Sequence, residues 1–403
     1  MPGPLEGIRV VEMGFWVAGP GAAGIMADWG AEVIKIEPPE GDPMRGMFLN
    51  AAGIDVPANP PFELDNRGKR SISLNLQHPD GRAVAHQLLA AADVFVTNVR
   101  QSALQKLGLT YDDLRSLNPR LVYGHLTGYG LEGEDKDRPA YDVGAYWARA
   151  GIAHSLVPHG ADPPQQRGGM GDHTAALTIA GAVCAALTAR QRTGAGQLVT
   201  TSLLRTGMYV LGWDLNTRLR FGHVAPPYTR STAPNPLISC YRAADDGWFW
   251  LLGLQGDRHW PDLVRAIERP ALRDDPRFRD IRARRANAAP LVALLDEIFG
   301  TRTRREWGAI FDRENVWWAP VQSADEVVND PQVHAAGGVV EVPVTDTAGD
   351  TVPMVATPAD FSGTPWRPSR AAPELGQHTE EILLDLGYDW ERITQLKEAG
   401  AIP

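Results

Sequence analysis

An aspartate that could do covalent chemistry, Asp172, stands at the start of a long run of small and apolar residues that continues to about Arg192. The composition of this run predicts a buried helix with Asp172 in its first turn. A carboxylate at that place usually caps the helix by accepting hydrogen bonds from backbone amides, and the pattern by itself favours this structural role. The alternative is nucleophilic attack on a carbonyl carbon. The glycines at 168, 169 and 171 would then let a bulky substrate approach the backbone.

A second pattern, Gly19-Pro20-Gly21-Ala22-Ala23-Gly24, has the spacing of a dinucleotide-binding turn, and Glu37 ends the next expected strand, where such sites hold a ribose hydroxyl. The fit is poor because five residues separate Met13, at the end of the first expected strand, from Gly19. We therefore expect glycines that let a helix pack closely on a sheet, with backbone amides that can still meet an anion. A nicotinamide-dependent dehydrogenase remains a minor alternative.

Basic residues gather in loops that follow later expected strands, at 66–70, at 98–100 and at Lys106. In an acidic protein such local clusters can cradle phosphate groups. They can equally form a solvated positive surface without a partner, and both interpretations stay open for any single cluster.

The overall charge and cysteine content exclude several classes of protein. The 403 residues include 39 Lys and Arg against 49 Asp and Glu, a net charge of −10, which argues against a dedicated nucleic-acid or anionic-membrane binder. Two cysteines, Cys184 and Cys240, cannot build a disulfide framework or a thiolate metal cluster. The N-terminal residues lack a signal-peptide pattern, and no stretch approaches 18 uninterrupted apolar residues. We expect a soluble, cytoplasmic protein without a metal.

Strand and helix patterns alternate over the first 130 residues, and these elements must position the residues described above. Strand patterns at 8–13, 32–37, 71–76, 94–97 and 121–123 alternate with longer helical patterns. Strands separated by helices require a doubly wound, mostly parallel, Rossmann-like α/β sheet. Ligands of such sheets bind at the carboxyl ends of the strands.

The pattern changes after about residue 200 and predicts a second, smaller α+β domain. Residues 1–200 are expected to form the first part of the large domain, 201–235 a linker, 236–325 the small domain, 326–350 a return linker and 351–403 the completion of the large domain. A strand is expected at 248–252, helices at 258–268, 288–299 and 303–313, two further strands at 339–344 and 352–356, and helices at 380–386 and 390–399.

Several separated motifs, in order along nearly the whole chain, resemble the family III CoA-transferases, the CaiB/BaiF group of formyl-CoA and carnitine CoA-transferases that shares a superfamily with the 2-methylacyl-CoA racemases. The motifs include Pro4–Val10, Ala27–Glu37, Asn66–Ser71, Leu117–Tyr123, Gly171–Asp172, Gly194–Gln197 and Leu375–Thr379. The resemblance implies that Asp172 is the nucleophile of an acyl-CoA:carboxylate CoA-transferase, with an acyl-CoA donor, a carboxylic acid acceptor and no permanently bound cofactor. It also implies an interlocked homodimer, in which each chain passes through the ring formed by its partner's two domains.

The resemblance further places eight residues near CoA: Trp16, Val17, Lys69, Asn98, Lys106, Thr127, Tyr129 and Tyr141. Lys69 and Lys106 are expected at the phosphates, and the adenine near the loop after Val96. Val17 cannot make the hydrogen bond of the glutamine-containing pair that formyl-CoA transferases have at positions 16 and 17.

The acceptor pocket is expected to differ from that of the formyl-CoA transferases. Their second domain carries a glycine-rich loop, and Thr232–Pro236 stands in its place here. Four aromatic residues are candidates for a larger apolar pocket: Trp16, Phe48, Tyr209 and Trp213.

A racemase of the same superfamily is the main alternative, because it needs an acid and a base on opposite faces of the α-carbon. The racemases draw one of these groups from a His-Asp dipeptide, and Tyr141-Asp142 stands at that position here, which favours a transferase. His173 adjoins Asp172, but consecutive helical residues point about 100° apart. His125 is better explained as a packed or exposed strand residue. A noncatalytic CoA-binding protein is the remaining alternative.

Overall fold

The computed structural model describes residues 3–158, 160–344 and 349–403, and it divides into two compact units. Unit one comprises Met1–His154, Pro164–Val224 and Ala336–Pro403, and unit two comprises Ser155–Pro163 and Ala225–Ala335. The chain therefore leaves the large unit and returns to it. Such a discontinuous large domain is what the sequence pattern predicts, with somewhat different boundaries.

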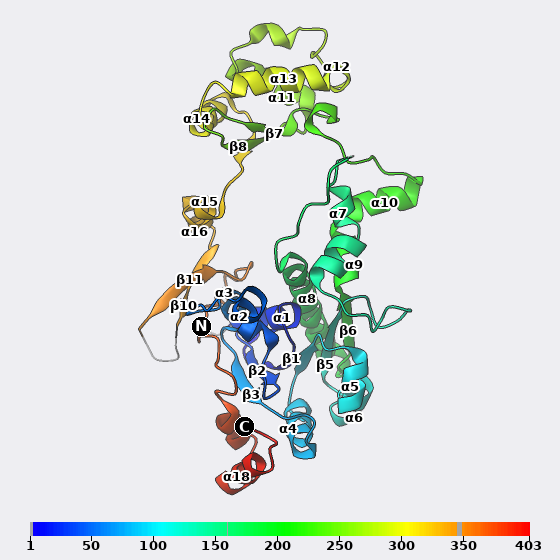
Figure 1. Cartoon of the computed structure of the whole chain (residues 1–403), viewed down its shortest axis with the longest axis vertical. Coiled ribbons are helices and arrows are strands. Elements are labelled where there is room, and N and C mark those ends of the chain that lie inside the picture. Colours follow the sequence, from blue (N-terminus) through cyan, green and yellow to red (C-terminus); the bar gives the residue numbers. More distant parts are fainter. Residues whose placement is uncertain (1–2, 159, 345–348) are drawn as a thin grey trace. The chain divides into compact units, whose positions relative to one another are not determined.

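Unit one is built on a six-stranded sheet in which every pair of neighbouring strands is parallel (Figure 1). Its strands are β1 (Arg9–Met13), β2 (Glu32–Glu37), β3 (Arg70–Ser73), β4 (Val94–Thr97), β5 (Val122–Thr127) and β6 (Leu198–Ser202). The order β3-β2-β1-β4-β5-β6 confirms the Rossmann-like prediction. The winding direction reverses between β1 and β4, and ligands of such sheets bind at that point.

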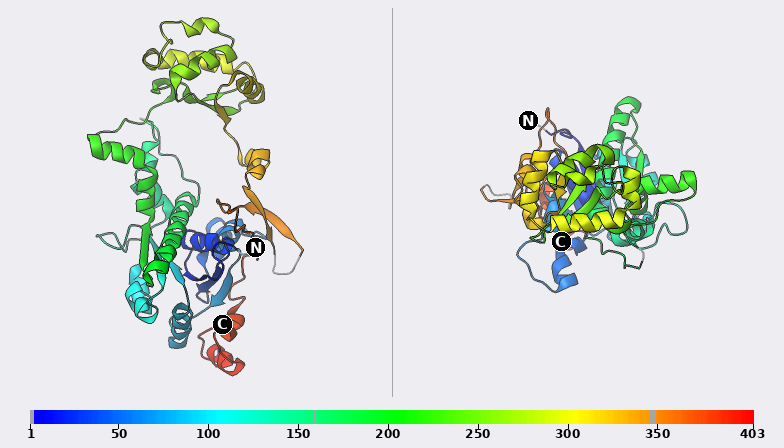
Figure 2. Two further views of the ribbon diagram at one scale, coloured as in Figure 1. Left: turned by 180° about the vertical axis from the view of Figure 1, so that it is seen from behind. Right: turned by 90° about the horizontal axis from the view of Figure 1, so that it is seen from above.

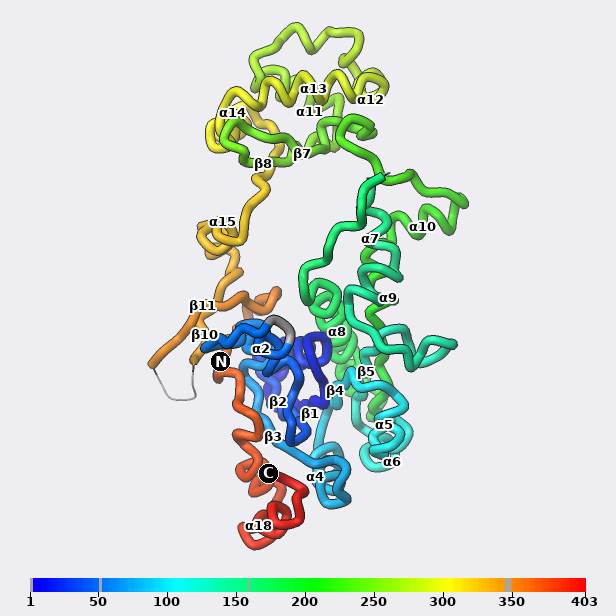
Figure 3. The backbone as a smooth tube through the Cα atoms, viewed as in Figure 1, coloured from blue at the N-terminus to red at the C-terminus, as the bar shows by residue number. Residues whose placement is uncertain are grey.

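Helices cover both faces of this sheet, because successive strand residues point to opposite sides. Val10 packs in a core formed with α1 (Ala18–Asp28) and α8 (Met170–Thr193), whereas Val11 packs in a second core on the other face. That second core includes α4 (Pro79–Ala90), α5 (Gln101–Leu107), α6 (Tyr111–Leu117), α17 (Thr379–Asp385) and α18 (Trp390–Glu398). The C-terminal segment thus completes the large unit and lies beside α4 (Figure 3).

The glycine pattern lies inside α1 rather than in a strand-to-helix turn. A Cβ atom at Gly24 would lie 2.6 Å from the backbone oxygen of Asp65, so this glycine lets α1 pack directly on α3 (Pro60–Asn66). The dinucleotide interpretation is therefore wrong, and the close-packing interpretation is confirmed.

The expected linker over 201–235 is largely helical, since it holds α9 (Leu203–Val210), α10 (Gly212–Phe221) and the short η3 (Arg230–Thr232). Leu203 and Thr206 of α9 are buried in unit one, but α10 buries none of its residues, which explains why its sequence lacks an apolar stripe. The other elements of unit one are η1 (Pro43–Gly46), α2 (Met47–Ala52), the π-helix η2 (Val143–Arg149) and the antiparallel pair β10 (Val339–Pro343) and β11 (Thr351–Val355); α7 (Ile152–Ser155) spans the boundary with unit two.

Unit two packs helices on an antiparallel sheet with its own aromatic core (Figure 2). The strands are β7 (Ile238–Arg242), β8 (Trp248–Leu252) and β9 (Trp318–Pro320). The helices are α11 (Gly256–Ala266), η4 (Pro270–Arg273), α12 (Ile281–Ala286), α13 (Ala288–Phe299), α14 (Arg304–Glu314), α15 (Ala324–Val328) and α16 (Pro331–Ala335). The strand at 248–252 and the helix at 288–299 lie at their predicted positions.

Helix α8 is long and apolar enough to cross a membrane, the one such helix in the part of the chain that the structure describes. It packs against α1, β5 and β6 and buries Ala175, Ile179 and Val183. A core helix of a globular unit has the same composition, so this packing accounts for the apolarity of α8.

A buried network of charged groups lies under the loop that follows β1. Glu12 receives hydrogen bonds from two lysines, Lys35 at 2.9 Å and Lys69 at 2.7 Å, and none of the three side chains is exposed. Lys35 also donates to Asp42 Oδ2 at 3.0 Å. Asp42 Oδ1 in turn accepts from the backbone N–H of Trp16 at 3.0 Å. The network therefore fixes the loop that carries Trp16.

Burial opposes every charge in this network, yet the charges stabilise one another. Burial works against ionisation of Glu12, but the two ammonium groups outweigh it and lower the pKa of Glu12. Burial also lowers the pKa of Lys69 to about 8, against the attraction of Glu12. Lys35 faces three carboxylates, and these raise its pKa despite burial.

We expect Glu12→Gln to destabilise the protein by about 3–5 kcal/mol, because removing one partner leaves a buried ammonium group without a counter-ion. The midpoint of urea unfolding measures this change. Lys397→Ala is the matched control, since the pair between Lys397 and Glu380 is exposed and should contribute less than about 1 kcal/mol. A Glu12→Gln midpoint no lower than that of the control would contradict the role of the network.

Candidate active site

Asp172 is the third residue of α8, and the residue that precedes the helix is Gly169, in the left-handed conformation with φ 79°. The N-cap residue, a glycine, offers no side chain to the first amides of α8. In the described part of the chain, the Asp172 carboxylate takes part in no hydrogen bond or ion pair. The capping role that the sequence pattern favours is therefore wrong, because the helix begins two residues earlier than expected and Asp172 does not lie at the cap.

The backbone beside Asp172 is held by two neighbours from the segment around η2. Asp142 Oδ2 accepts hydrogen bonds from the N–H of Gly171 at 3.2 Å and from Gln166 Nε2 at 3.1 Å. A Cβ atom at Gly171 would lie 2.5 Å from the ring of Tyr146, so only glycine fits there. Gly171 therefore allows the start of α8 to pack against the ring of Tyr146, and Asp142 fixes the first turn of the helix through a hydrogen bond.

The electrostatic surroundings of Asp172 disfavour its ionised form. Burial raises the pKa of Asp172 to about 7, and the negative charges of Asp142 and Asp65 add to this rise, while His173 opposes it. A half-desolvated carboxylate without hydrogen bonds is a stronger nucleophile than a capped one, because no donor must be displaced before attack.

A hollow of about 520 Å³ lies at the carboxyl ends of β1, β2, β4 and β5, where the sheet reverses its winding direction. This volume lies in the range of about 300–1,000 Å³ that ligand sites occupy. Four of the eight residues expected near CoA line it, namely Trp16, Asn98, Thr127 and Tyr141. The rings of Trp16 and Tyr141 meet edge to face with centroids 5.7 Å apart.

The loop that carries Trp16 is held in a strained conformation. Trp16 has φ 66°, which is unfavourable for a residue with a side chain. Asn98 clamps the neighbouring residue, since its side chain accepts from the N–H of Phe15 at 2.9 Å and donates to its carbonyl at 2.8 Å. Asn98 therefore shapes the wall of the hollow through the loop.

The remaining expected CoA contacts lie in different surroundings. Lys69 is fully buried and donates to Glu12, to the carbonyl of Pro20 and to Asn66, so all three of its hydrogens are used. Lys69 consequently has no donor left for a phosphate, and we correct its expected role to a structural one. Lys106 is exposed on α5, outside the lining of the hollow.

Val17 and Tyr129 adjoin the hollow without lining it. A Cβ atom at Gly169 would lie 3.9 Å from Val17, so Val17 approaches the start of α8. The guanidinium of Arg149 lies 4.7 Å from the ring centre of Tyr129. Thr127, which does line the hollow, accepts a hydrogen bond from the N–H of Gly130 at 2.9 Å and fixes the turn after β5.

The positive charges that line the hollow are Arg100, Lys136 and Arg138. Only the first belongs to a basic cluster in the sequence. Lys136 lies between Asp135 and Asp137, and Arg138 directly follows this acidic segment, so the local composition conceals both cations. Their position after the expected strand 121–123 could have indicated that they lie at the ligand-binding edge of the sheet.

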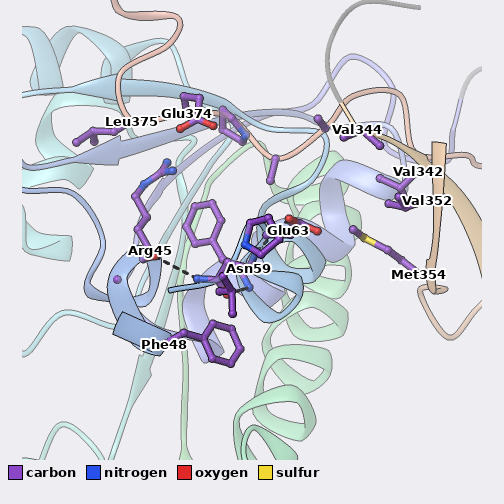
Figure 4. Close-up of a pocket in the computed structure, with 18 of the residues that line it drawn as sticks. Arg45, Phe48, Asn59, Glu63, Val342, Val344, Val352, Met354, Glu374 and Leu375 are labelled. Atoms are coloured by element: carbon purple, nitrogen blue, oxygen red, sulfur yellow. Dashed lines mark hydrogen bonds between the residues drawn. The ribbon is translucent and has the colours of Figure 1, made fainter. Parts of the chain in front are cut away.

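A second cavity, of about 550 Å³, lies between α3, the loop around α2 and the β10–β11 pair (Figure 4). Its lining is mostly apolar and includes Phe48, Phe62, Val342, Val352 and Met354. The aromatic residues expected to share one pocket are thus separated. Phe48 lines this cavity, Trp16 lines the hollow, and Tyr209 and Trp213 are each 88% exposed on α9 and α10.

The histidines considered for a racemase have other partners. His125 is buried in β5 with its Nε2 2.8 Å from the carbonyl oxygen of Val99, and burial lowers its pKa. His173 Nε2 lies 3.0 Å from Asp65 Oδ1, an interaction that sequence patterns do not reveal because the residues are 108 positions apart. Among the described residues, no group of three or more His, Cys, Asp or Glu could hold a metal ion.

Comparisons with known proteins agree with this architecture. A family model described as CoA-transferase family III matches residues 5–379. The (R)-2-hydroxy-4-methylpentanoate CoA-transferase of Clostridioides difficile is 36% identical over 401 residues, which is 99% of each chain. The cinnamoyl-CoA:phenyllactate CoA-transferase of Clostridium sporogenes is 32% identical over 98% of this chain and 96% of that protein. The crystal structure of a CAIB/BAIF family protein from Brucella suis matches with a TM-score of 0.83 and 30% identity, covering 96% of this chain and all of the other.

These matches extend over nearly the whole length of the chain and of its relatives. They agree with the parallel sheet and with the family that the sequence motifs indicate. The chain belongs to CoA-transferase family III and is a CoA-transferase that acts on CoA thioesters.

Proposed function

We propose that the protein transfers CoA between carboxylic acids and that Asp172 is the nucleophile. The observation that supports this proposal is that the Asp172 carboxylate makes no hydrogen bond within the described part of the chain. Its pKa is raised to about 7, mainly by burial and next by the charge of Asp142. Perturbed carboxyl groups of this kind cluster at catalytic sites. The neighbouring hollow, whose wall includes Tyr141, supplies room for CoA.

The reaction proceeds through covalent intermediates. The Asp172 carboxylate attacks the thioester carbonyl and the carbon–sulfur bond breaks. CoA departs as a thiolate, and the acyl group stays on Asp172 as a mixed anhydride. The thiolate then attacks the aspartyl carbonyl, which frees the donor acid as its carboxylate and forms an aspartyl-CoA thioester. An acceptor carboxylate reverses these two steps and departs as the new acyl-CoA. No external oxidant, reductant or net proton is needed.

We expect Asp172→Asn to abolish CoA transfer while the protein stays folded. Asparagine is similar in size, but its amide cannot form the anhydride, so transfer should fall by at least about a thousandfold. With wild-type enzyme and acyl-CoA, mass spectrometry after borohydride or hydroxylamine treatment should locate the modification at Asp172. The carboxylic acids tested as acceptors include 2-hydroxy-4-methylpentanoate and phenyllactate, because two relatives are named for these acids.

Two results would contradict this assignment. One is near-normal transfer by the Asp172→Asn variant. The other is exchange of the α-proton of a 2-methylacyl-CoA in deuterated water that is faster than CoA transfer, which would favour the racemase. Asp142→Asn serves as a matched control for local structure, because it keeps the hydrogen bond to Gly171 through its amide oxygen and should retain the covalent adduct.

We infer that CoA phosphates bind the cations of the hollow, chiefly Arg100 and Lys136. Replacing either by alanine should raise KM for acyl-CoA about tenfold with little change in kcat, since contacts remote from the thioester contribute mostly uniform binding. Lys106→Ala tests the original phosphate assignment in the same assay. If KM rises only in Lys106→Ala and in neither of the other two variants, the CoA phosphates bind along α5, and the inference about Arg100 and Lys136 is wrong.

We also propose that the protein is an interlocked homodimer. Large apolar side chains on α9 and α10 are exposed in the single chain, among them Tyr209, Trp213 and Leu219. Monomeric proteins rarely expose several large apolar side chains on neighbouring helices, and a partner subunit would bury them.

Light scattering should therefore give twice the chain mass at micromolar concentration, and dilution should not release a folded monomer. Trp213→Glu should lower the melting temperature or the yield of dimer, because it places a charge in the interface. Trp390→Glu, at an exposed tryptophan of α18, should change neither. A stable wild-type monomer would contradict the proposal.

A further inference from the structure

The imidazole of His173 occupies a slot between two glycines. A Cβ atom at Gly169 would lie 3.2 Å from ring atom Cε1, and a Cβ atom at Gly21 of α1 would lie 3.6 Å from Cδ2. The contact at Gly169 is tight and favours a residue without a side chain, whereas a Cβ atom at Gly21 would be in ordinary contact with the ring and only 3.1 Å from Asp65 Oδ1. The ring is thereby held in place on the residue next to Asp172.

The partner of this imidazole is a buried acid on another helix. Asp65, in the last turn of α3, has a side chain that is 3% exposed, and its Oδ1 lies 3.0 Å from His173 Nε2. Its other oxygen, Oδ2, is buried and makes no hydrogen bond within the described part of the chain. The end of α3 is itself fixed, because Lys69 donates to Asn66 at 3.0 Å.

The charged groups that face His173 are all acidic. They are Asp65 from α3, Asp172 on α8 itself and Asp142 from the segment before η2, while α1 contributes only glycine beside the ring. The hydrogen bond with Asp65 raises the pKa of His173 most, and the three negative charges add to it against the effect of burial. Lys69 and Lys35 act on Asp65 and not on the imidazole.

We propose that Asp65 and His173 are positioning residues for the nucleophile: Asp65 holds His173 in place through the contact with Nε2 and favours its protonated form, and the imidazolium in turn favours the ionised form of the Asp172 carboxylate. The inference rests on the proposed function, since the pair has this task only if Asp172 is the attacking group. Without a positive neighbour, the carboxylate would face Asp142 and Asp65 alone, and both disfavour its charge.

A purely structural role, in which the pair only joins α3 to α8, predicts a different pH behaviour. Loss of a structural contact lowers the rate by a similar factor at every pH. Loss of the charge instead moves the protonation of Asp172 to higher pH and leaves the rate at alkaline pH unchanged. The pH profile of adduct formation therefore separates the two roles.

The experiment measures single-turnover formation of the covalent adduct by mass spectrometry between pH 5.5 and 9, with an acyl-CoA that the wild-type enzyme accepts. The wild-type rate should fall as the pH drops through about 7, because Asp172 then takes up a proton. His173→Gln keeps an amide for Asp65 but loses the charge. Its midpoint should move up by about one pH unit, so the rate is about tenfold lower at pH 6 and equal at pH 9.

Two variants serve as controls for charge and for histidine content. His173→Lys retains a positive charge, and its midpoint should stay within a few tenths of the wild-type value. His86→Gln replaces a half-buried histidine of α4, whose ring contacts the carbonyl of Gly108, and should leave the profile unchanged. An equal loss at all pH values in His173→Gln, or a shift as large in His173→Lys, overturns the proposal.

A measurement independent of turnover covers the case in which His173→Gln does not fold. NMR titration of ¹³C-labelled histidine in the resting enzyme should show a pKa of His173 above its ordinary value, and Asp65→Asn should lower it. An unchanged titration in Asp65→Asn overturns the proposal. Failure of the proposed function is distinguishable, because it appears as retained transfer in Asp172→Asn whatever the His173 variants do.

Discussion

The carboxylate of Glu12, shared between two buried ammonium groups, is the constraint on which the active site depends. Through Lys35 and Asp42 it fixes the backbone of Trp16 in a conformation that a tryptophan does not adopt freely. Buried ion pairs are expensive to desolvate and add little net stability. Their value here is geometric, because hydrogen bonds to both carboxylate oxygens set the position of two chain segments at once.

The second branch of the network leads toward the proposed nucleophile. Lys69 donates to Asn66 at the end of α3, and the preceding residue, Asp65, meets His173 beside Asp172. Glu12 in β1 is therefore connected to the neighbour of Asp172 through three hydrogen bonds, from Lys69 to Glu12, from Lys69 to Asn66, and between Asp65 and His173. This explains why a lysine with the sequence context of a phosphate ligand is wholly enclosed instead.

The surroundings of Asp172 in the folded protein disfavour the negative charge of its carboxylate. The N-terminus of a 24-residue helix favours an anion, yet burial and the charge of Asp142 outweigh this and raise the pKa of Asp172. Because the folded pKa exceeds the ordinary value of 3.8, this group lowers the stability of the folded state progressively as the pH rises from about 4 to about 7. The penalty is complete above that range and absent below it. A group held in that way gains stability when it forms a neutral ester-like bond, which is the chemistry proposed for it.

Sequence patterns predict the layers of this protein well and its polar contacts poorly. The parallel sheet, α8 and the strand Trp248–Leu252 follow from local periodicity, which depends on neighbours a few positions away. The partners of Lys69 and His173 lie 57 and 108 positions distant, so no local pattern contains them. The helical segment at 212–221 was missed for a related reason: it buries no residue and so has no apolar stripe to recognise.

The sheet topology places the cations proposed to bind CoA and the carboxylate proposed to attack the thioester on different elements. The cations that suit CoA phosphates belong to loops after β4 and β5, whereas the carboxylates and His173 come from α3, α8 and the residue that precedes η2. The two groups meet where Tyr141 lines the hollow and its neighbour Asp142 binds the start of α8. One pair of adjacent residues therefore connects the wall of the hollow to the backbone beside the proposed nucleophile, because Tyr141 lines the hollow and Asp142 binds the N–H of Gly171.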